Sequence, residues 1–123
     1  MTQEQEELLL KDLCSRLPYG VKVQRYSYED DVETIETLSE IASDGYMSTL
    51  ECDTLKHIAK PYLFPLSSMT EEQSIEYGKL CERYCPASIY SMEIIDWFHK
   101  NHFDYRDLIP MGLAIDATGL NIY

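Results

Sequence analysis

Residues 8–24 read LLLKDLCSRLPYGVKVQ, and within this stretch the spacing of apolar side chains changes from helical to extended. The first half predicts one apolar stripe on a helix, formed by Leu9, Leu10, Leu13 and Leu17. Residues 18–20, Pro-Tyr-Gly, then end that helix. From Val21 onward apolar and polar side chains alternate, which is the period of a strand. A helix followed by strands, with helices again later in the chain, predicts the α+β class.

The start of the first helix is marked by its capping residues. Thr2 and Gln5 have the spacing of a capping box, in which each side chain bonds a free backbone N–H group. The acidic residues Glu4, Glu6 and Glu7 lie near the positive end of the helix dipole. We therefore expect this helix to begin directly after Thr2.

A small antiparallel sheet is predicted after the first helix. The alternation that starts at Val21 continues to Tyr28, and residues 29–31 form a polar turn. Residues 32–41 are ambiguous between strand and helix, and their β-branched content favours a strand paired with the first one. Residues 46–52 predict a third strand, and 53–59 either a connection or a further strand. Three successive strands predict a meander.

An apolar connector and two helices are expected next. Residues 60–66, KPYLFPL, contain two prolines and predict an extended connector that packs across the core. Thr70 and Gln73 again have capping-box spacing, and the helix that they start should run to about Tyr84. Its inward residues would be Ile75, Leu80 and Tyr84. Ser91 is the candidate N-cap of a third helix that ends near Asn101, and an irregular C-terminal segment follows.

The largest side chains of this second half are expected in the core. Burial of such side chains contributes roughly 1.5–3 kcal/mol each, so a small domain can hardly leave all of them in water. The prediction concerns Tyr62, Leu63, Phe64, Trp97 and Phe98. The alternative is an exposed apolar docking site for a partner.

Length and charge limit the function classes. The 123 residues, 45% of them hydrophobic, predict one small acidic domain spanning 1–123. The net charge of −12 disfavours direct nucleic-acid binding and docking on anionic membranes, because both depend on cationic side chains. Neither a membrane span nor a basic leader is visible, so we expect a cytoplasmic protein. The oligomeric state is not predicted.

The cysteines do not form a strong metal-binding motif. Cys14, Cys52, Cys81 and Cys85 are expected to be reduced and mostly buried, as in cytosolic proteins. On helices, the pair Cys81/Cys85 and the pair His99/His102 would each share one face, so a zinc site of two cysteines and two histidines is conceivable. The spacing matches such sites only loosely. We predict neither a metal nor another cofactor.

No catalytic residue is predicted. The acidic pairs Asp30-Asp31 and Glu71-Glu72 fit a turn and a helix start, and the five glycines form no phosphate-binding loop. The candidate interaction residues are Phe103, Tyr105 and Arg106, because tyrosine and arginine are favoured at binding hot spots. Alternatively, Phe103 and Tyr105 anchor the end of the third helix to the core.

Three stretches carry a family resemblance: 13–21, LCSRLPYGV; 60–72, KPYLFPLSSMTEE; and 96–109, DWFHKNHFDYRDLI. Together they resemble a family of small uncharacterised proteins encoded in phages, prophages and other mobile elements of gut bacteria. The resemblance covers most of the chain but is weakest between residues 29 and 58. It implies an accessory role in a mobile element and transfers no functional residue.

Three function classes follow from these observations. The leading hypothesis is a non-enzymatic module that binds another protein. The second is an acidic mimic of nucleic acid that inhibits a host nuclease or regulator, which requires carboxylates concentrated on one face. The third is a small enzyme whose site is built from residues distant in sequence.

Overall fold

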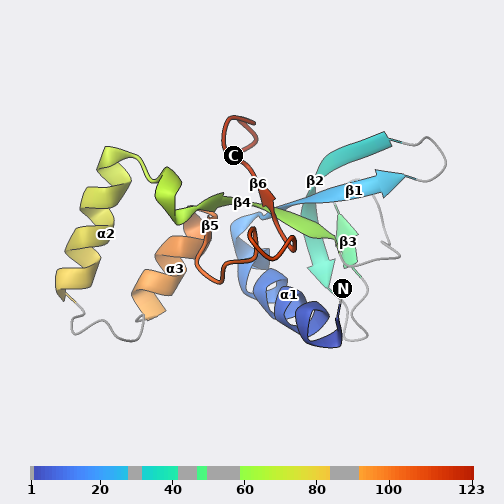
Figure 1. Ribbon diagram of the computed structural model, residues 1–123, viewed down its shortest axis with the longest axis horizontal. Coiled ribbons are helices and arrows are strands. Elements are labelled where there is room, and N and C mark those ends of the chain that lie inside the picture. The colour runs from blue at the N-terminus through green and yellow to red at the C-terminus, as the bar shows by residue number, and fades with distance from the viewer. Residues whose placement is uncertain (1, 28–31, 42–46, 50–58, 84–91) are drawn as a thin grey trace.

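The computed structural model describes residues 2–27, 32–41, 47–49, 59–83 and 92–123. These residues form an α+β fold in which one helix covers a mixed sheet and two further helices lie beyond the end of that sheet (Figure 1). The expected helices, an N-terminal one and two later ones, are present.

Helix α1 (Gln3–Arg16) begins and ends where the sequence predicts. The Thr2 hydroxyl accepts from the Gln5 N–H at 3.1 Å, and the Gln5 side chain accepts from the Thr2 N–H at 3.0 Å. A 3-10 turn over Leu17–Tyr19 follows, and Gly20 has a φ of +72°, a left-handed conformation that glycine adopts without strain. The chain thereby turns directly into the sheet.

The sheet is larger than the predicted three-stranded meander. Its order is β3-β2-β1-β4-β5, with β6 also paired to β4. The bounds are β1 (Lys22–Ser27), β2 (Val32–Ile41), β3 (Met47–Thr49), β4 (Lys60–Pro65), β5 (Phe103–Asp104) and β6 (Ile115–Asp116). The pairs β1–β2, β2–β3 and β1–β4 are antiparallel, whereas β4 pairs in parallel with β5 and β6. The strand alternative for residues 32–41 is confirmed.

The predicted connector at residues 60–66 is mostly a strand, and this changes the topology. Pro61 and Pro65 lack a backbone N–H, but the residues between them can still form backbone hydrogen bonds to the neighbouring strands. The Phe64 N–H donates to the His102 carbonyl at 2.8 Å, and the Leu63 carbonyl accepts from the Ala117 N–H at 2.8 Å. The prolines therefore mark the ends of β4 rather than excluding it from the sheet.

Helices α2 (Glu71–Arg83) and α3 (Met92–Lys100) pack against each other (Figure 1). The predicted capping box of α2 is present, with both bonds between Thr70 and Gln73. The prediction that Ile75 faces inward is wrong, because it is 53% exposed. Tyr77 faces α3. Ile75 lies two positions earlier in the helix and therefore points to nearly the opposite side. Leu80 is half-buried, while Tyr84 and Ser91 lie outside the described residues.

Two hydrophobic clusters make up the interior. The first joins α1 to the sheet and contains eleven buried residues, among them Leu9 and Leu13. The second lies where α2 and α3 meet the end of β4, and its buried members are Ile94, Phe98 and Phe103. The core prediction for five large residues is confirmed: Tyr62, Leu63 and Phe98 are buried, and Phe64 and Trp97 are half-buried.

The cysteines depart from expectation. Both described cysteines are free thiols, as expected, but neither is buried: Cys14 is exposed, and Cys81 is half-buried at the margin of the second hydrophobic cluster. Cys52 and Cys85 lie outside the described residues. In the part of the chain that the structure describes, no helix has the length and apolar character needed to cross a bilayer.

Candidate functional site

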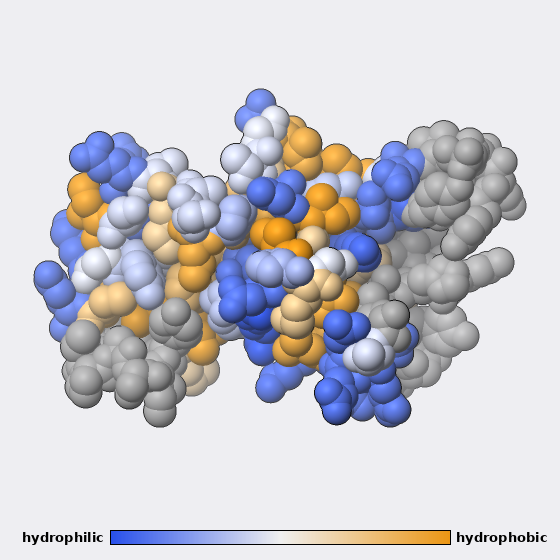
Figure 2. Space-filling model, viewed as in Figure 1, coloured by the Kyte–Doolittle hydropathy of each residue, from blue (hydrophilic) through white to orange (hydrophobic). Residues whose placement is uncertain are grey.

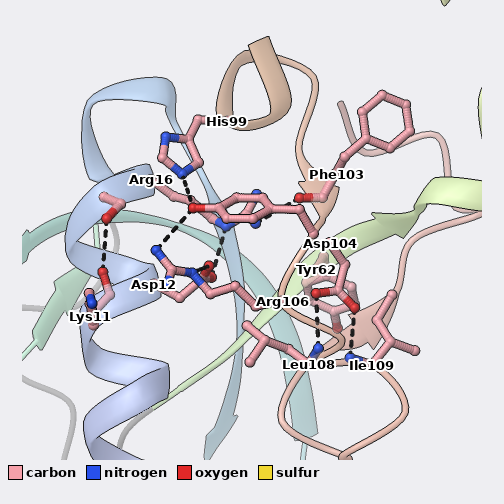
Figure 3. Close-up of polar contacts among 12 residues, drawn as sticks. Lys11, Asp12, Arg16, Tyr62, His99, Phe103, Asp104, Arg106, Leu108 and Ile109 are labelled. Carbon is pink, nitrogen blue, oxygen red and sulfur yellow. Dashed lines mark hydrogen bonds and ion pairs between the residues drawn. The ribbon is translucent and has the colours of Figure 1, made fainter. Parts of the chain in front are cut away.

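Five polar side chains gather between the two hydrophobic clusters, and we call them the junction cluster: Asp12, Arg16, His99, Tyr105 and Arg106. Helix α1 supplies the first two, α3 the third, and the segment after β5 the last two. Figure 3 shows Asp12, Arg16, His99 and Arg106 pointing toward one another between α1 and the segment that follows α3. The cluster therefore joins the sheet half of the molecule to the α2–α3 half.

A fully buried ion pair lies at its centre. Asp12 and Arg16 are both 0% exposed, and Oδ2 of the carboxylate accepts from Nε of the guanidinium at 2.8 Å. The same guanidinium donates from Nη2 to the Phe103 carbonyl at 2.7 Å. The second oxygen of Asp12 accepts from Arg106 Nε at 3.1 Å. One carboxylate thus serves two guanidinium groups, as a buried charge requires for its desolvation to be offset.

Tyr105 connects this ion pair to α3. Its hydroxyl lies 2.7 Å from His99 Nε2 and accepts from Arg106 Nη2 at 3.0 Å. Both guanidinium groups also lie against its ring, Arg16 at 5.3 Å and Arg106 at 5.0 Å from the centroid. Because Arg106 offers only donors, the phenolic proton is directed to His99, whose Nε2 then acts as the acceptor.

The electrostatics keep both rings neutral. Burial lowers the pKa of His99, and the nearby Arg16 lowers it further, against the opposing effect of Asp12. Burial raises the pKa of Tyr105, which outweighs the lowering by the two arginines. At neutral pH the pair is therefore an uncharged imidazole and an uncharged phenol.

This arrangement favours a structural role over catalysis. A general base must reach a substrate proton, whereas His99 is 5% exposed and its Nε2 is already bonded to Tyr105. Among the described residues, Arg16 Nη1 is a buried donor of the cluster without a partner, and its side chain has no exposed surface. The junction cluster can position α1 against α3, but it presents no free acid, base or nucleophile.

The segment that follows β5 is fixed by a carboxylate that sequence reasoning missed. Asp104 is 4% exposed, and its two oxygens accept from the N–H groups of Leu108 and Ile109, each at 2.9 Å (Figure 3). An aspartate that precedes a short polar run is the usual signal for such a turn. This turn aims Tyr105 and Arg106 back at α1.

A second buried carboxylate lies on β2. Glu36 is 5% exposed and accepts hydrogen bonds from Thr34 and Thr49, and from Arg25 at 3.1 Å. Burial raises the pKa of Glu36, but these three donors together lower it below the ordinary value. All four residues lie on strands, so this network ties the antiparallel part of the sheet together.

The three candidate interaction residues fall into different environments. Phe103 is 1% exposed and belongs to the second hydrophobic cluster. Tyr105 is half-buried in the junction cluster, and the Arg106 side chain is 21% exposed. The Phe103 carbonyl accepts from Arg16, so Phe103 lies beside the junction cluster to which the other two belong.

The conceivable zinc site does not form from the described residues. Helix α3 ends at Lys100, so His102 leaves the face that His99 occupies and has a φ of +60°. His99 lies against Tyr105, while His102 stacks on Tyr123. In the described ranges no three histidine, cysteine or acidic side chains are grouped to hold a metal ion, and Cys85 lies outside those ranges.

The rings of Tyr77, Trp97, Phe98 and Phe103 meet at the junction of α2 and α3, and we call them the aromatic cluster. Tyr77 stacks on Trp97 at 5.8 Å between ring centroids, and Trp97 stacks in turn on Phe103 at 5.5 Å. Phe98 stacks on Tyr105 at 5.3 Å, which links this cluster to the junction cluster. Figure 2 shows apolar side chains collected along this junction on the viewed face.

Comparison of the chain with protein-family models, curated proteins and solved structures finds no match in any of the three. The function must therefore be argued from the geometry alone. The resemblance to a family of phage and mobile-element proteins stays a prediction.

Proposed function

We propose that this chain is a non-enzymatic protein-binding module and that the aromatic cluster is its contact surface. The partner is another polypeptide that places an apolar segment along the junction of α2 and α3. The family resemblance adds the proposal of an accessory role in a phage or another mobile element.

The observation that carries this proposal is how incompletely the aromatic cluster is buried. Among the described residues, the first hydrophobic cluster has eleven buried members and five half-buried ones. The cluster beneath α2 and α3 has three buried members and eight half-buried ones, including Tyr77 and Trp97. Helix α2 itself has no buried residue. Partly exposed aromatic side chains of this kind are typical of interaction surfaces.

The charges around the aromatic cluster define the partner's chemistry. Six exposed acidic residues lie on the two helices, Glu71, Glu72, Glu76, Glu82, Glu93 and Asp96, against three exposed basic ones, Lys79, Arg83 and Lys100. The chain as a whole carries −12. A partner segment with an apolar face flanked by lysine or arginine is therefore complementary, and salt should weaken its binding.

The other two function classes have less support. The junction cluster pairs its histidine and tyrosine with each other, which leaves no group free for acid–base chemistry. Exposed carboxylates occur on α1, β2, α2, α3 and β6. That distribution over five elements does not favour the single acidic face that a nucleic-acid mimic needs.

Trp97 provides a direct test, because it is the single tryptophan of the chain. We expect affinity purification from the native host to recover a partner, and the purified complex to protect Trp97 from quenching by acrylamide. Leu80, half-buried on α2 at the margin of the second hydrophobic cluster, is replaced in the variant Leu80→Glu. This charge should weaken binding at least about tenfold, which corresponds to about 1.4 kcal/mol.

The matched control is Ile35→Glu, which places the same charge at an apolar residue that is 43% exposed on β2. It should leave binding unchanged. The proposal is wrong if Trp97 is quenched equally in the free and bound chain, or if the two variants weaken binding to the same extent. Recovery of the chain always alone, with turnover of a small molecule, would favour the enzyme hypothesis instead.

A further inference from the structure

The phenol of Tyr123 occupies a specific slot on the sheet, between β1 and β4. Its hydroxyl accepts from the Lys22 N–H at 2.8 Å and donates to the Tyr62 carbonyl at 2.8 Å. Both hydrogen-bonding capacities of the phenol are thus satisfied by backbone groups. The residue is nevertheless 41% exposed, so the ring reaches this position from the surface.

The slot exists because the pairing of β1 and β4 stops early. The two strands pair at Gln24↔Lys60 and at Val23↔Pro61. The next antiparallel pair would be Lys22 and Tyr62, and these are the two residues whose backbone groups bind the phenol. The hydroxyl of Tyr123 therefore stands in the place of a direct hydrogen bond between the strands.

Two aromatic rings form the walls of the slot. His102 stacks on Tyr123 with 3.6 Å between centroids and 13° between planes, and Phe64 lies at 5.9 Å. His102 has a φ of +60°, which costs a non-glycine residue energy and indicates that its position is imposed by the fold. Its Nδ1 is buried and has no hydrogen-bond partner in the described part of the chain.

The segment that delivers Tyr123 is attached weakly elsewhere. The Ala117 N–H donates to the Leu63 carbonyl at 2.8 Å and so marks the last ladder bond. Residues 118–121 are exposed, and within the described chain they form only local hydrogen bonds, to Asp116 and Ala117. Residues 118–123 thus form a strap whose bonds to the sheet are made by the Tyr123 side chain.

We propose that the slot bounded by Lys22, Tyr62, Phe64 and His102 is a recognition site for a 4-hydroxyphenyl group, which the strap of residues 118–123 fills as a detachable ligand. The required chemistry is a flat ring that bears a hydroxyl able to donate and accept at once. Phenylalanine lacks the hydroxyl, and a lysine or an acid has no ring to stack on His102. When the strap lifts, the slot can take a tyrosine of another polypeptide.

This proposal does not depend on the partner proposed for the aromatic cluster, and a small phenol tests it. In the full-length variant Tyr123→Ala, p-cresol should bind in the vacated slot and shift the amide resonances of Lys22 and His102. Toluene has the same shape without the hydroxyl and should bind about tenfold more weakly, since the two backbone groups would stay unpaired. The unsubstituted chain should bind neither compound there.

A peptide of residues 117–123, ATGLNIY, distinguishes the strap from other tyrosines. If the strap residues contribute binding energy beyond the ring, the peptide should bind Tyr123→Ala more tightly than N-acetyltyrosinamide does. If only the phenol is recognised, the two should bind equally well. Either result supports the site. The proposal is overturned if p-cresol binds no better than toluene, or if it binds the unsubstituted chain equally well.

A second variant covers the case in which Tyr123→Ala does not fold. Tyr123→Phe keeps both ring contacts and removes the hydroxyl from the Lys22 N–H. We expect the Lys22 amide to exchange its hydrogen at least about tenfold faster, because it loses its acceptor. An unchanged exchange rate and amide resonance at Lys22 would show that the phenol does not occupy the slot in solution.

Discussion

The carboxylate of Asp12 and the guanidinium of Arg16 form a 2.8 Å ion pair on successive turns of α1, and neither side chain has any exposed surface. Such a pair is costly to desolvate, and further hydrogen bonds must offset that cost. Here the guanidinium reaches the Phe103 carbonyl, and the carboxylate reaches Arg106. The pair therefore orients the segment that follows α3, and four predictions follow from its surroundings and from the two histidines beyond it.

Replacing Arg16 alone should destabilise the protein strongly. In Arg16→Met the buried carboxylate of Asp12 keeps Arg106 but loses its closest partner, and breaking one side of a buried ion pair costs about 3–5 kcal/mol. Urea unfolding measures the change. Lys11→Met, at an exposed position of the same helix, is the control and should stay within about 0.5 kcal/mol. A loss below about 1 kcal/mol for Arg16→Met would contradict a buried pair.

Removing the hydroxyl of Tyr105 should cost less. Tyr105→Phe keeps the stacking on Phe98 but leaves His99 Nε2 without its bond, and an unsatisfied buried group costs about 1–3 kcal/mol. Thermal unfolding measures the loss. The control is Tyr19→Phe, since Tyr19 also packs its ring on His99 but is 36% exposed. Equal effects of the two variants would show that the hydroxyl of Tyr105 contributes nothing specific.

The local elements of this fold could be predicted because their signals lie within a few residues. Capping boxes at Thr2 and Thr70, the stop at Gly20 and the alternation after Val21 all involve neighbours in sequence. Each of these features acts through the backbone within one turn or one strand. The starts of α1 and α2 and the first two strands therefore followed from the sequence alone.

The mixed part of the sheet could not be predicted, because nothing local marks it. Strands β5 and β6 have two residues each, which is too short for any period to be visible. Their pairing to β4 is parallel and joins positions such as Phe64 and Phe103 that lie far apart in the chain. Two prolines in residues 60–66 also favoured a connector over the strand that is present.

The junction cluster was missed for the same reason. Its bonds from Arg16 to Phe103 and from Arg106 to Asp12 span 87 and 94 residues. On α1 the pair Asp12 and Arg16 has the four-residue spacing of an ordinary surface ion pair. The available signal was that these two charges lie among the leucines of the apolar stripe, next to Leu13 and Leu17.

Replacing Asp104 should lower the free energy of unfolding more than replacing Asp107, three residues later. Asp104→Asn replaces one acceptor oxygen by an NH₂ group that faces a backbone N–H, so one bond to Leu108 or Ile109 is lost. We expect a loss of about 1–3 kcal/mol in urea unfolding. Asp107→Asn is the matched control, because Asp107 is exposed and asparagine tolerates its φ of +58°. It should change stability by less than about 0.5 kcal/mol.

Two histidines should make stability depend on pH. Burial, with smaller contributions from Arg16 and Lys22, lowers the pKa of His102 from 6.5 to about 4. The unfolded chain therefore binds a proton near pH 6.5 that the folded chain binds only near pH 4, so stability falls as the pH is lowered through this window. The whole shift corresponds to ~3 kcal/mol, and because solvent reaches part of the ring we expect about 2 kcal/mol between pH 7 and pH 4.

The variant His102→Asn isolates that contribution. Asparagine does not titrate and accepts the left-handed backbone at this position, although it loses the stacking on Tyr123 and should lower stability at pH 7. Between pH 7 and pH 4 its free energy of unfolding should fall less steeply than that of the unsubstituted chain. His99, whose pKa is also lowered, and the carboxylates titrate in both proteins, so the difference in slope belongs to His102. Parallel curves from urea unfolding across this range would mean that His102 is not held neutral beneath Tyr123.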